Sequence, residues 1–246
     1  MGPPKTLSKS VKIYASDEKM IGPKNLFAGW LGDVSPDFSA ELLKRGEWME
    51  MQTGSILYSI GEDQSSLWGL ASGMVRMHVS MNEHEGRLGH IVGPGFWFGE
   101  YELVAGGPRI MEMEAAEDPV LLRVRPDVLK DILARSPENW RWLTLLAVQH
   151  QAVAITAADD LMLRSAVKRL AALLLRLSGR RAAHPSSMPL DTIPATQQEV
   201  ALAANMSRAT AGEILRDFEA AGLISRDYRA IHIHQARGLS GLLSKD

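Results

Sequence analysis

The chain contains no cysteine among its 246 residues. This absence excludes disulfide bonds and any iron–sulfur cluster held by thiolates, and it is typical of a reducing compartment. No apolar run approaches the roughly 20 residues of a membrane-spanning helix. The N-terminal residues also lack the apolar core of a secretion signal. We therefore expect a cytoplasmic protein with no membrane contact.

An excess of basic residues is missing as well. The net charge is −2, and residues 185–246 carry six basic against seven acidic side chains. Any affinity for nucleic acid must then come from local placement of charge. Residues 160–184 form one such place, with a single acid, Asp160, although we expect most of the basic side chains there on a solvated helix face. These are Arg164, Lys168, Arg169, Arg176, Arg180 and Arg181.

Residues 196–224 have the pattern of two short helices joined by a tight turn. Thr196 and Glu199 have the spacing of a capping box at the start of the first helix. Asn205 tolerates the left-handed backbone of a sharp turn, and Ser207 is a good N-cap for the second helix. This arrangement is typical of the unit that docks in the DNA major groove. The alternative is an ordinary helical hairpin inside a globular core.

The residues behind the second helix favour DNA binding. Ile231 and Ile233 alternate with His232 and His234 as in a half-buried strand, and residues 226–229 are a candidate hairpin tip. A hairpin in this place is the wing of a winged helix. With it, the chain resembles the CRP/FNR family of bacterial transcription regulators (catabolite activator and fumarate-nitrate reductase regulator). The residues that carry the likeness are Ser207-Arg208, Thr210, Gly212, Ile214-Leu215, Phe218-Glu219 and Gly222-Leu223-Ile224.

The likeness extends over the N-terminal half. From about residue 38 to 125 the chain has the pattern of short strands broken by glycine-containing turns, which favours a sandwich or barrel. The segments GSILYSIGED, LASGMVR and FGE resemble the cyclic-nucleotide-binding jelly roll of the same family. Methionines alternate with polar residues here, and we interpret them as core filler.

A long helix is expected to follow, opened by Ser136, Pro137 and Glu138. Its apolar positions step by three and four, the seam of a two-stranded coiled coil. We predict that this helix forms a homodimer, with Asp159 as a polar departure from the seam. The seam residues are Leu145, Val148, Ala152, Ile155 and Met162.

The predicted fold class is α+β. A flexible tail (1–25) precedes a double-stranded β-helix, or jelly-roll, sensor domain that resembles cyclic-nucleotide-binding domains (26–136). The dimerisation helix (137–162) and a winged helix-turn-helix DNA-binding domain (163–246) follow. The resemblance places the hinge between the domains near residues 161–165.

The resemblance also implies an effector site. In cyclic-nucleotide binders of this fold, the FGE segment and a later Arg followed by Ser or Thr hold the ribose and the cyclic phosphate. Gly99, Glu100 and Arg109 match this pattern, but Ile110 replaces the hydroxyl residue. On the dimer helix, the positions facing the base would be Ala154 and Ile155, which offer no side-chain hydrogen bond, with Thr156 beside them.

Each missing partner costs about 1–3 kcal/mol, so a cyclic nucleotide is disfavoured and an unknown small-molecule effector, or none, is expected. No cofactor is required. An ion pair between Glu100 and Arg109 is the structural alternative for these two residues.

The DNA-reading residues are expected in the first turn of the second helix. The candidates there are Ser207, Arg208, Ala209, Thr210 and Glu213. Gln197 and Gln198, at the start of the first helix, are candidates for phosphate contacts. Ala209 and Glu213 depart from the residues common in the family, so the common half-site does not transfer. A dimer would read an inverted repeat in double-stranded DNA, and the resemblance implies RNA polymerase as a partner. Glu213 can instead form an ion pair with Arg216.

Two other functions remain open. A metal-dependent barrel enzyme would need a set such as His84, His90 and Glu100, but the spacing matches no metal signature. We therefore expect no catalytic and no metal-binding residues. The second alternative is a dimeric ligand sensor that acts through a protein partner, which the near-neutral C-terminal domain favours.

Overall fold

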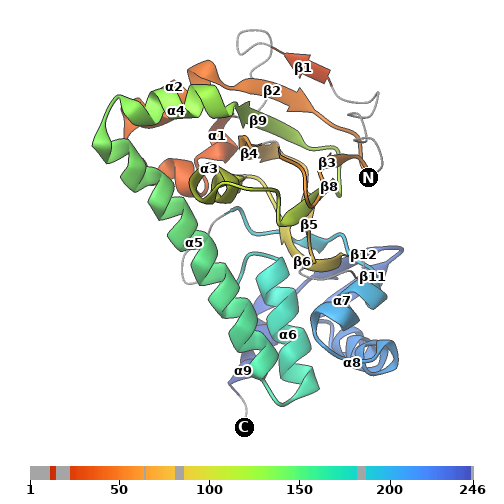
Figure 1. The fold of residues 1–246 in the computed structure, drawn as a ribbon. Helices are drawn as coiled ribbons and strands as arrows, with labels where there is room; N and C mark the ends of the chain where they lie inside the picture. Colours follow the sequence, from red (N-terminus) through yellow and green to blue (C-terminus); the bar gives the residue numbers. More distant parts are fainter. Residues whose placement is uncertain (1–11, 15–22, 64, 81–85, 182–186, 245–246) are drawn as a thin grey trace.

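The computed structural model describes residues 12–14, 23–63, 65–80, 86–181 and 187–244 (Figure 1). A β-rich lobe and a helical lobe lie along one long helix, which runs past both. This architecture confirms the predicted α+β class, with a β sensor domain, a long helix and a winged helix-turn-helix. Within the described part, no helix is both long and apolar enough to cross a bilayer.

The sensor lobe is built from two antiparallel sheets. Its strands are β1 (Lys12–Tyr14), β2 (Glu47–Glu50), β3 (Ile56–Tyr58), β4 (Leu67–Ser72), β5 (Val75–Val79), β6 (Arg87–Val92), β7 (Trp97–Phe98), β8 (Met111–Ala115) and β9 (Val120–Val124). One sheet has the order β1-β2-β9-β4-β7 and the other the order β3-β8-β5-β6. The register of β5 against β6 shifts between Met77, which pairs with His90, and His78, which pairs with Leu88. Gly89 is therefore the extra residue of a β-bulge.

The all-strand expectation for residues 38–125 is wrong at two places, where the chain is helical. The lobe's helices are α1 (Pro23–Leu26), a 3₁₀ turn at Trp30–Gly32, α2 (Pro36–Arg45), α3 (Glu100–Ala105) and α4 (Pro126–Ala134). α2 forms because Ser35 accepts a hydrogen bond from the backbone N–H of Phe38 and Pro36 opens the first turn. The predicted tail also includes residues 23–25, which begin α1; most of that tail lies outside the described residues.

The long helix α5 (Pro137–Met162) starts at the predicted N-cap, Ser136, whose side chain accepts from the N–H of Glu138. It ends before α6 (Ala166–Leu177), so the helical run is broken at residues 163–165. Ser165 caps α6, and the guanidinium of Arg169 donates to the carbonyl of Leu163 at 2.7 Å. The break is therefore stabilised by local hydrogen bonds to backbone groups.

The C-terminal lobe contains the predicted helix-turn-helix and wing. Its elements are β10 (Thr192–Ile193), α7 (Gln197–Ala203), α8 (Arg208–Ala220), β11 (Ile224–Asp227), β12 (Ala230–Ile233) and α9 (Ala236–Leu243). Both halves of the capping box form between Thr196 and Glu199, and Asn205 has a positive φ of 50°. The β10-β12-β11 sheet supplies the wing, with Tyr228 and Arg229 at its tip.

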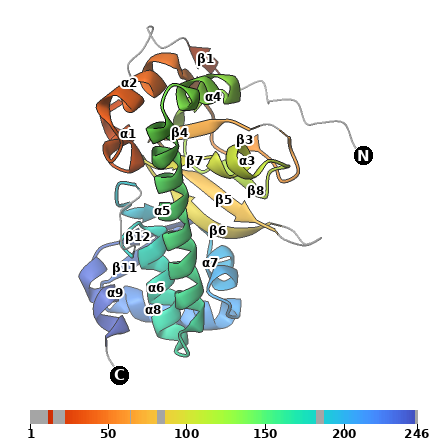
Figure 2. The same cartoon turned by 60° about the vertical axis from the view of Figure 1, so that its left-hand side comes forward.

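The C-terminal lobe packs directly on the sensor, with β6 next to α7 in both views (Figure 2). Leu88 and Ile91 of β6 belong to the same apolar cluster as the cores of α6, α7 and α8. The Nε of Arg76 donates to the carbonyl of Pro194 at 2.8 Å, and the N–H of Met188 donates to the carbonyl of Pro94 at 2.8 Å. The helix-turn-helix lobe thus packs against one sheet of the barrel.

Candidate functional site

The first turn of α8 presents part of the expected reading set to solvent. Arg208, Ala209 and Glu213 are exposed. Ser207 caps the helix by accepting from the N–H of Thr210 at 3.0 Å, and the two hydroxyls lie 2.8 Å apart. Those hydroxyls are partly occupied with each other, so the free side chains are those of Arg208 and Ala209 in this turn and of Glu213 in the next.

The alternative ion pair of Glu213 is absent. Glu213 and Arg216 are both described and exposed, and no ion pair joins them or binds either to another described residue. The carboxylate of Glu213 therefore stays available as a hydrogen-bond acceptor on the exposed face of α8.

The two glutamines at the start of α7 differ in their surroundings. Gln198 is exposed, whereas Gln197 donates from Nε2 to the carbonyl of Arg208 at 2.9 Å and accepts from Arg226 at 3.3 Å. Gln197 therefore fastens α7 to the first turn of α8. A Cβ on Gly212 would lie 2.5 Å from that same Nε2, so a larger residue at this position would displace the end of the Gln197 side chain.

A cleft of about 410 Å³ lies between these helices and the wing. Arg208, Arg226 and Arg229 all line it, and Tyr228 beside them is 93% exposed. Arg226 also donates to Glu219 at 2.5 Å, and this hydrogen bond lowers the pKa of Glu219. Sequence reasoning placed residues 226–229 at a hairpin tip but missed that they line one cleft with Arg208 of α8.

The basic run of residues 160–184 is mostly structural, so the expectation of a solvated face is wrong for its larger part. Arg176 and Arg181 both pair with Asp160, at 3.0 and 2.5 Å, and Arg180 pairs with Asp191 at 2.5 Å. Arg169 donates to backbone carbonyls instead. Arg164 and Lys168 are the two whose side chains neither hydrogen-bond nor ion-pair with another described residue.

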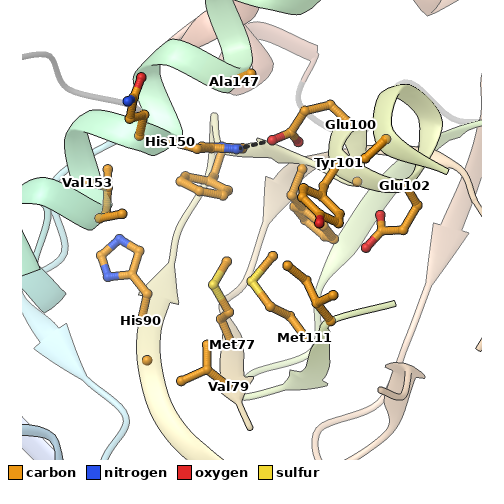
Figure 3. Close-up of a pocket in the computed structure, with 18 of the residues that line it drawn as sticks. Met77, Val79, His90, Glu100, Tyr101, Glu102, Met111, Ala147, His150 and Val153 are labelled. Carbon is orange, nitrogen blue, oxygen red and sulfur yellow. Dashed lines mark hydrogen bonds and ion pairs between the residues drawn. The ribbon is translucent and has the colours of Figure 1, made fainter. Parts of the chain in front are cut away.

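A second candidate site is a cavity of about 800 Å³ between the barrel and α5 (Figure 3). Most of its wall is apolar, from Met77, Val79, Phe96, Phe98, Ile110, Met111, Leu143, Ala147, Val153, Ala154 and Ala157. The polar part of the wall includes Tyr58, His90, Glu100, Tyr101, Glu102, Thr144, His150, Gln151 and Arg176. Two methionines expected as core filler, Met77 and Met111, thus face the cavity.

The cavity brings together half of the expected effector residues. Gly99, Glu100 and Ile110 line it. Arg109, Ile155 and Thr156 are outside its lining.

The outlying residues have other neighbours. Ile155 is 62% exposed on α5, and the hydroxyl of Thr156 donates to the carbonyl of Ala152 at 2.9 Å.

Arg109 is committed to partners inside the barrel. Its guanidinium pairs with Glu102, reaches the carbonyl of Ser66 at 3.4 Å, and lies 3.9 Å from the ring centre of Tyr58. The alternative of an ion pair between Arg109 and Glu100 is therefore wrong, because the carboxylate that Arg109 pairs with is that of Glu102. Arg109 is also buried, and its charge is compensated by Glu102.

Glu100 pairs with a residue of the long helix, His150. The Nδ1 of His150 lies 2.6 Å from Oε1 of Glu100 (Figure 3). Burial raises the pKa of Glu100, but the charge and hydrogen bond of His150 outweigh it, so the net pKa is lowered. Sequence reasoning missed His150. The one signal in the sequence is that His150 is the single titratable residue between Leu143 and Ala158.

His90 is a buried, uncharged residue on the opposite wall. Burial first, and the positive charge of Arg176 second, lower its pKa to about 3. Its Nδ1 has no hydrogen-bond partner among the described atoms. In the described part of the chain, no three His, Asp or Glu residues are grouped as a metal site, and His84 lies outside that part.

The predicted seam of α5 carries exposed apolar side chains. Val148, Ile155 and Met162 are 53%, 62% and 80% exposed, at intervals of seven residues, and Leu145 and Ala152 are partly exposed between them. The polar departure, Asp159, pairs with Arg181 of its own chain at 3.2 Å.

Known proteins match both lobes. The family described as the Crp-like helix-turn-helix domain matches residues 168–242, and the cyclic nucleotide-binding domain family matches residues 48–136. A CRP-like cAMP-activated global transcriptional regulator of Mycobacterium tuberculosis (strain ATCC 25618 / H37Rv) is 25% identical over 213 residues, which are 87% of this chain and 95% of that protein.

Solved structures agree in fold. A CRP/FNR family transcriptional regulator from Thermus thermophilus is 25% identical with a TM-score of 0.60, and the match covers 80% of this chain and 98% of that one. FixK2 from Bradyrhizobium japonicum is 18% identical with a TM-score of 0.65, and the match covers 82% and 98% of the two chains.

Proposed function

Since this chain belongs to the CRP/FNR family of DNA-binding transcription regulators, we propose that it acts as a homodimer on an inverted-repeat operator. We further propose that a small molecule other than cyclic AMP controls it. The observation that carries the first proposal is the exposed first turn of α8 beside a wing, both with arginines at a common cleft. We propose RNA polymerase as its protein partner and the cytoplasm as its location.

The proposed DNA contacts follow from exposure and charge. Arg208 can form a bidentate contact with guanine, Glu213 can accept from cytosine N4, and the methyl group of Ala209 can pack against thymine. Gln198 and the wing arginine Arg229 can contact phosphates. Ser207, Thr210 and Gln197 contribute by holding the turn in shape, because their side chains bond to it.

The proposed dimer rests on the seam of α5. Apolar side chains at seven-residue intervals that are more than half exposed are costly in water, and a second copy of the helix would bury them. Two copies would present two reading turns to half-sites about one helical turn apart. A domain division at about residues 26–136, 137–162 and 163–246 agrees with this arrangement of sensor, seam and reader.

The effector proposal rests on the cavity. Ile110 supplies a hydrocarbon where a phosphate would need a donor, and the guanidinium of Arg109 is paired with Glu102. The Mycobacterium relative is named as cAMP-activated, but at 25% identity that ligand is not transferred to this chain.

A ligand sensor that acts through a protein partner is the second candidate. The six basic against seven acidic residues of the C-terminal segment favour it. Salt dependence separates the two functions, because DNA affinity falls steeply with salt in proportion to the phosphates contacted.

The test is selection of DNA sites from a random pool by the purified protein, followed by footprinting. We expect an inverted repeat, and Arg208→Ala should lower specific affinity by about 1–3 kcal/mol. Arg237→Ala is the charge-matched control, since Arg237 is exposed on α9, at the other side of the lobe. Failure to select any site, or an unchanged footprint with Arg208→Ala, would contradict the proposed reading turn.

A further inference from the structure

The wall of the cavity between the barrel and α5 restricts the charge of what can bind there. Arg176 is its one arginine or lysine, since no other occurs among the described lining residues. The Nε of Arg176 donates to Asp160 at 3.0 Å and its Nη1 donates to the carbonyl of Gly89 at 3.1 Å. Its charge is therefore compensated, and a ligand anion would find no free cation there.

The negative charges of the wall are also paired. Glu100 bonds to His150 at 2.6 Å, and Glu102 bonds to Arg109. A cationic ligand would have to replace one of these partners. An uncharged ligand displaces none of them and gains from the largely apolar surface.

The two histidines of this wall add little polar surface to it. Nε2 of His150 and Nδ1 of His90 make no hydrogen bond with a described atom, and both atoms are buried, so neither is open to the space of the cavity. The side chains of the two residues lie on facing walls, His90 from β6 and His150 from α5 (Figure 3).

The ring of His150 is held in place by two neighbours. It stacks on Phe96 with centroids 5.0 Å apart and an interplanar angle of 18°, and its Nδ1 lies 2.6 Å from Oε1 of Glu100. An occupant of the cavity therefore meets the two histidines chiefly through the faces and edges of their rings.

We propose that the cavity binds an uncharged, predominantly apolar small molecule. The proposal rests on the assignment of this cavity as the effector site and names the chemical class of the effector. The volume of about 800 Å³ suits a drug-sized molecule of this kind. Ile110, which removes the phosphate donor, adds apolar surface for the same ligand.

The first test uses two probes with one skeleton. N-phenyl-1-naphthylamine is uncharged with one N–H donor, and 1-anilinonaphthalene-8-sulfonate adds a negative charge. In fluorescence titrations of the full chain we expect the uncharged probe to bind about tenfold more tightly or better. Cyclic AMP, titrated by calorimetry, should bind more weakly still. Equal or tighter binding of the sulfonate or of cyclic AMP would overturn the proposal.

A cavity-filling variant shows where the probe binds. Val153→Phe places a larger side chain on the cavity wall, so it should weaken the uncharged probe at least about fivefold. An unchanged affinity would mean that the probe binds elsewhere, for example on the seam of α5, and would overturn the assignment.

His78→Phe is the control for that variant. His78 is on β5 but outside the cavity, so its replacement should leave the affinity for the uncharged probe unchanged. A loss equal to that of Val153→Phe would mean that both variants act through the fold, and it would overturn the assignment.

The outcome is separable from that of the proposed function, because DNA binding is measured independently. Operator binding without probe binding refutes the ligand class alone. Probe binding without operator binding refutes the DNA-binding role alone.

Discussion

Replacing Asp160 by asparagine should destabilise the protein more than any nearby surface change. The side chain of Asp160 is 3% exposed, and its two oxygens accept from Nε of Arg176 at 3.0 Å and from Nε of Arg181 at 2.5 Å. Asparagine keeps the shape but removes the charge and turns an NH₂ group toward one of the two guanidinium groups. Arg176 then remains buried as a cation with no counter-ion.

The expected loss of stability depends on the hydrogen bonds that Arg176 keeps in the variant. Breaking a buried ion pair from one side costs about 3–5 kcal/mol. Because Arg176 still donates to the carbonyl of Gly89, we expect the lower end, about 3 kcal/mol. This is about a 150-fold change in the ratio of folded to unfolded protein. For a chain of this length it corresponds to a Tm lower by about 6–12 °C.

Asp159→Asn is the matched control on the neighbouring residue. The side chain of Asp159 is 66% exposed and pairs with Arg181 at 3.2 Å. An exposed pair contributes under about 1 kcal/mol. Urea unfolding followed by tryptophan fluorescence and by circular dichroism, at one protein concentration, measures both variants. Losses of stability equal within about 0.5 kcal/mol would refute the reasoning, since burial would then not matter.

Three further changes test other parts of the structure. As the pH falls from 6.5 towards 3, the unfolded chain takes up a proton at His90 that the folded chain, with a pKa of about 3, does not. Stability should therefore drop by up to about 1.4 kcal/mol per pH unit from this group, and urea midpoints at pH 7 and 5 should differ less in His90→Leu than in the parent. Gly99→Ala should cost at least about 2 kcal/mol, because φ is 99° and a Cβ would lie 2.2 Å from the carbonyl oxygen of Ser66. Gly54→Ala, with positive φ but open space, should shift the Tm less. Ile155→Glu should sediment as a monomer where the parent is a dimer, and a persistent dimer would place the interface elsewhere.

The helix-turn-helix was predictable because its signals are local. Thr196 and Glu199 bond across three residues, Ser207 caps through Thr210, and Asn205 needs only its own backbone freedom. Each depends on interactions within about one helical turn, which a single sequence displays directly.

The cavity was not predictable in the same way. The partner of Glu100 lies 50 residues further along the chain, at His150, and no spacing rule connects a barrel helix to a distant one. The sequence does not show whether Glu100 or Glu102 forms the ion pair with Arg109. The structure shows that Glu102 does. Resemblance to nucleotide binders located this region, but packing determines which of its side chains face the ligand space.

The same reason explains the misread arginines. A run of cations on a helix indicates a solvated face when nothing is known of its neighbours. Here Asp160, near the end of α5, pairs with Arg176 of α6 and with Arg181, which follows α6, and α6 packs against β6. Asp160 and Arg176 are 16 residues apart, on either side of the non-helical residues 163–165, and helical periodicity does not reveal such a contact.

Strand β6 separates the cavity from the apolar core of the C-terminal lobe. Gly89 and His90 border the cavity, while Leu88 and Ile91 belong to the core that supports the reading helices. The carbonyl of Gly89, at the bulge, accepts a hydrogen bond from Arg176, so this strand is joined to the C-terminal lobe by a hydrogen bond as well as by apolar packing. A ligand in the cavity can change the affinity of the protein for its operator through this strand. By thermodynamic linkage, the operator then changes the affinity of the protein for that ligand by the same factor. The cavity and that core are separated by the thickness of one strand.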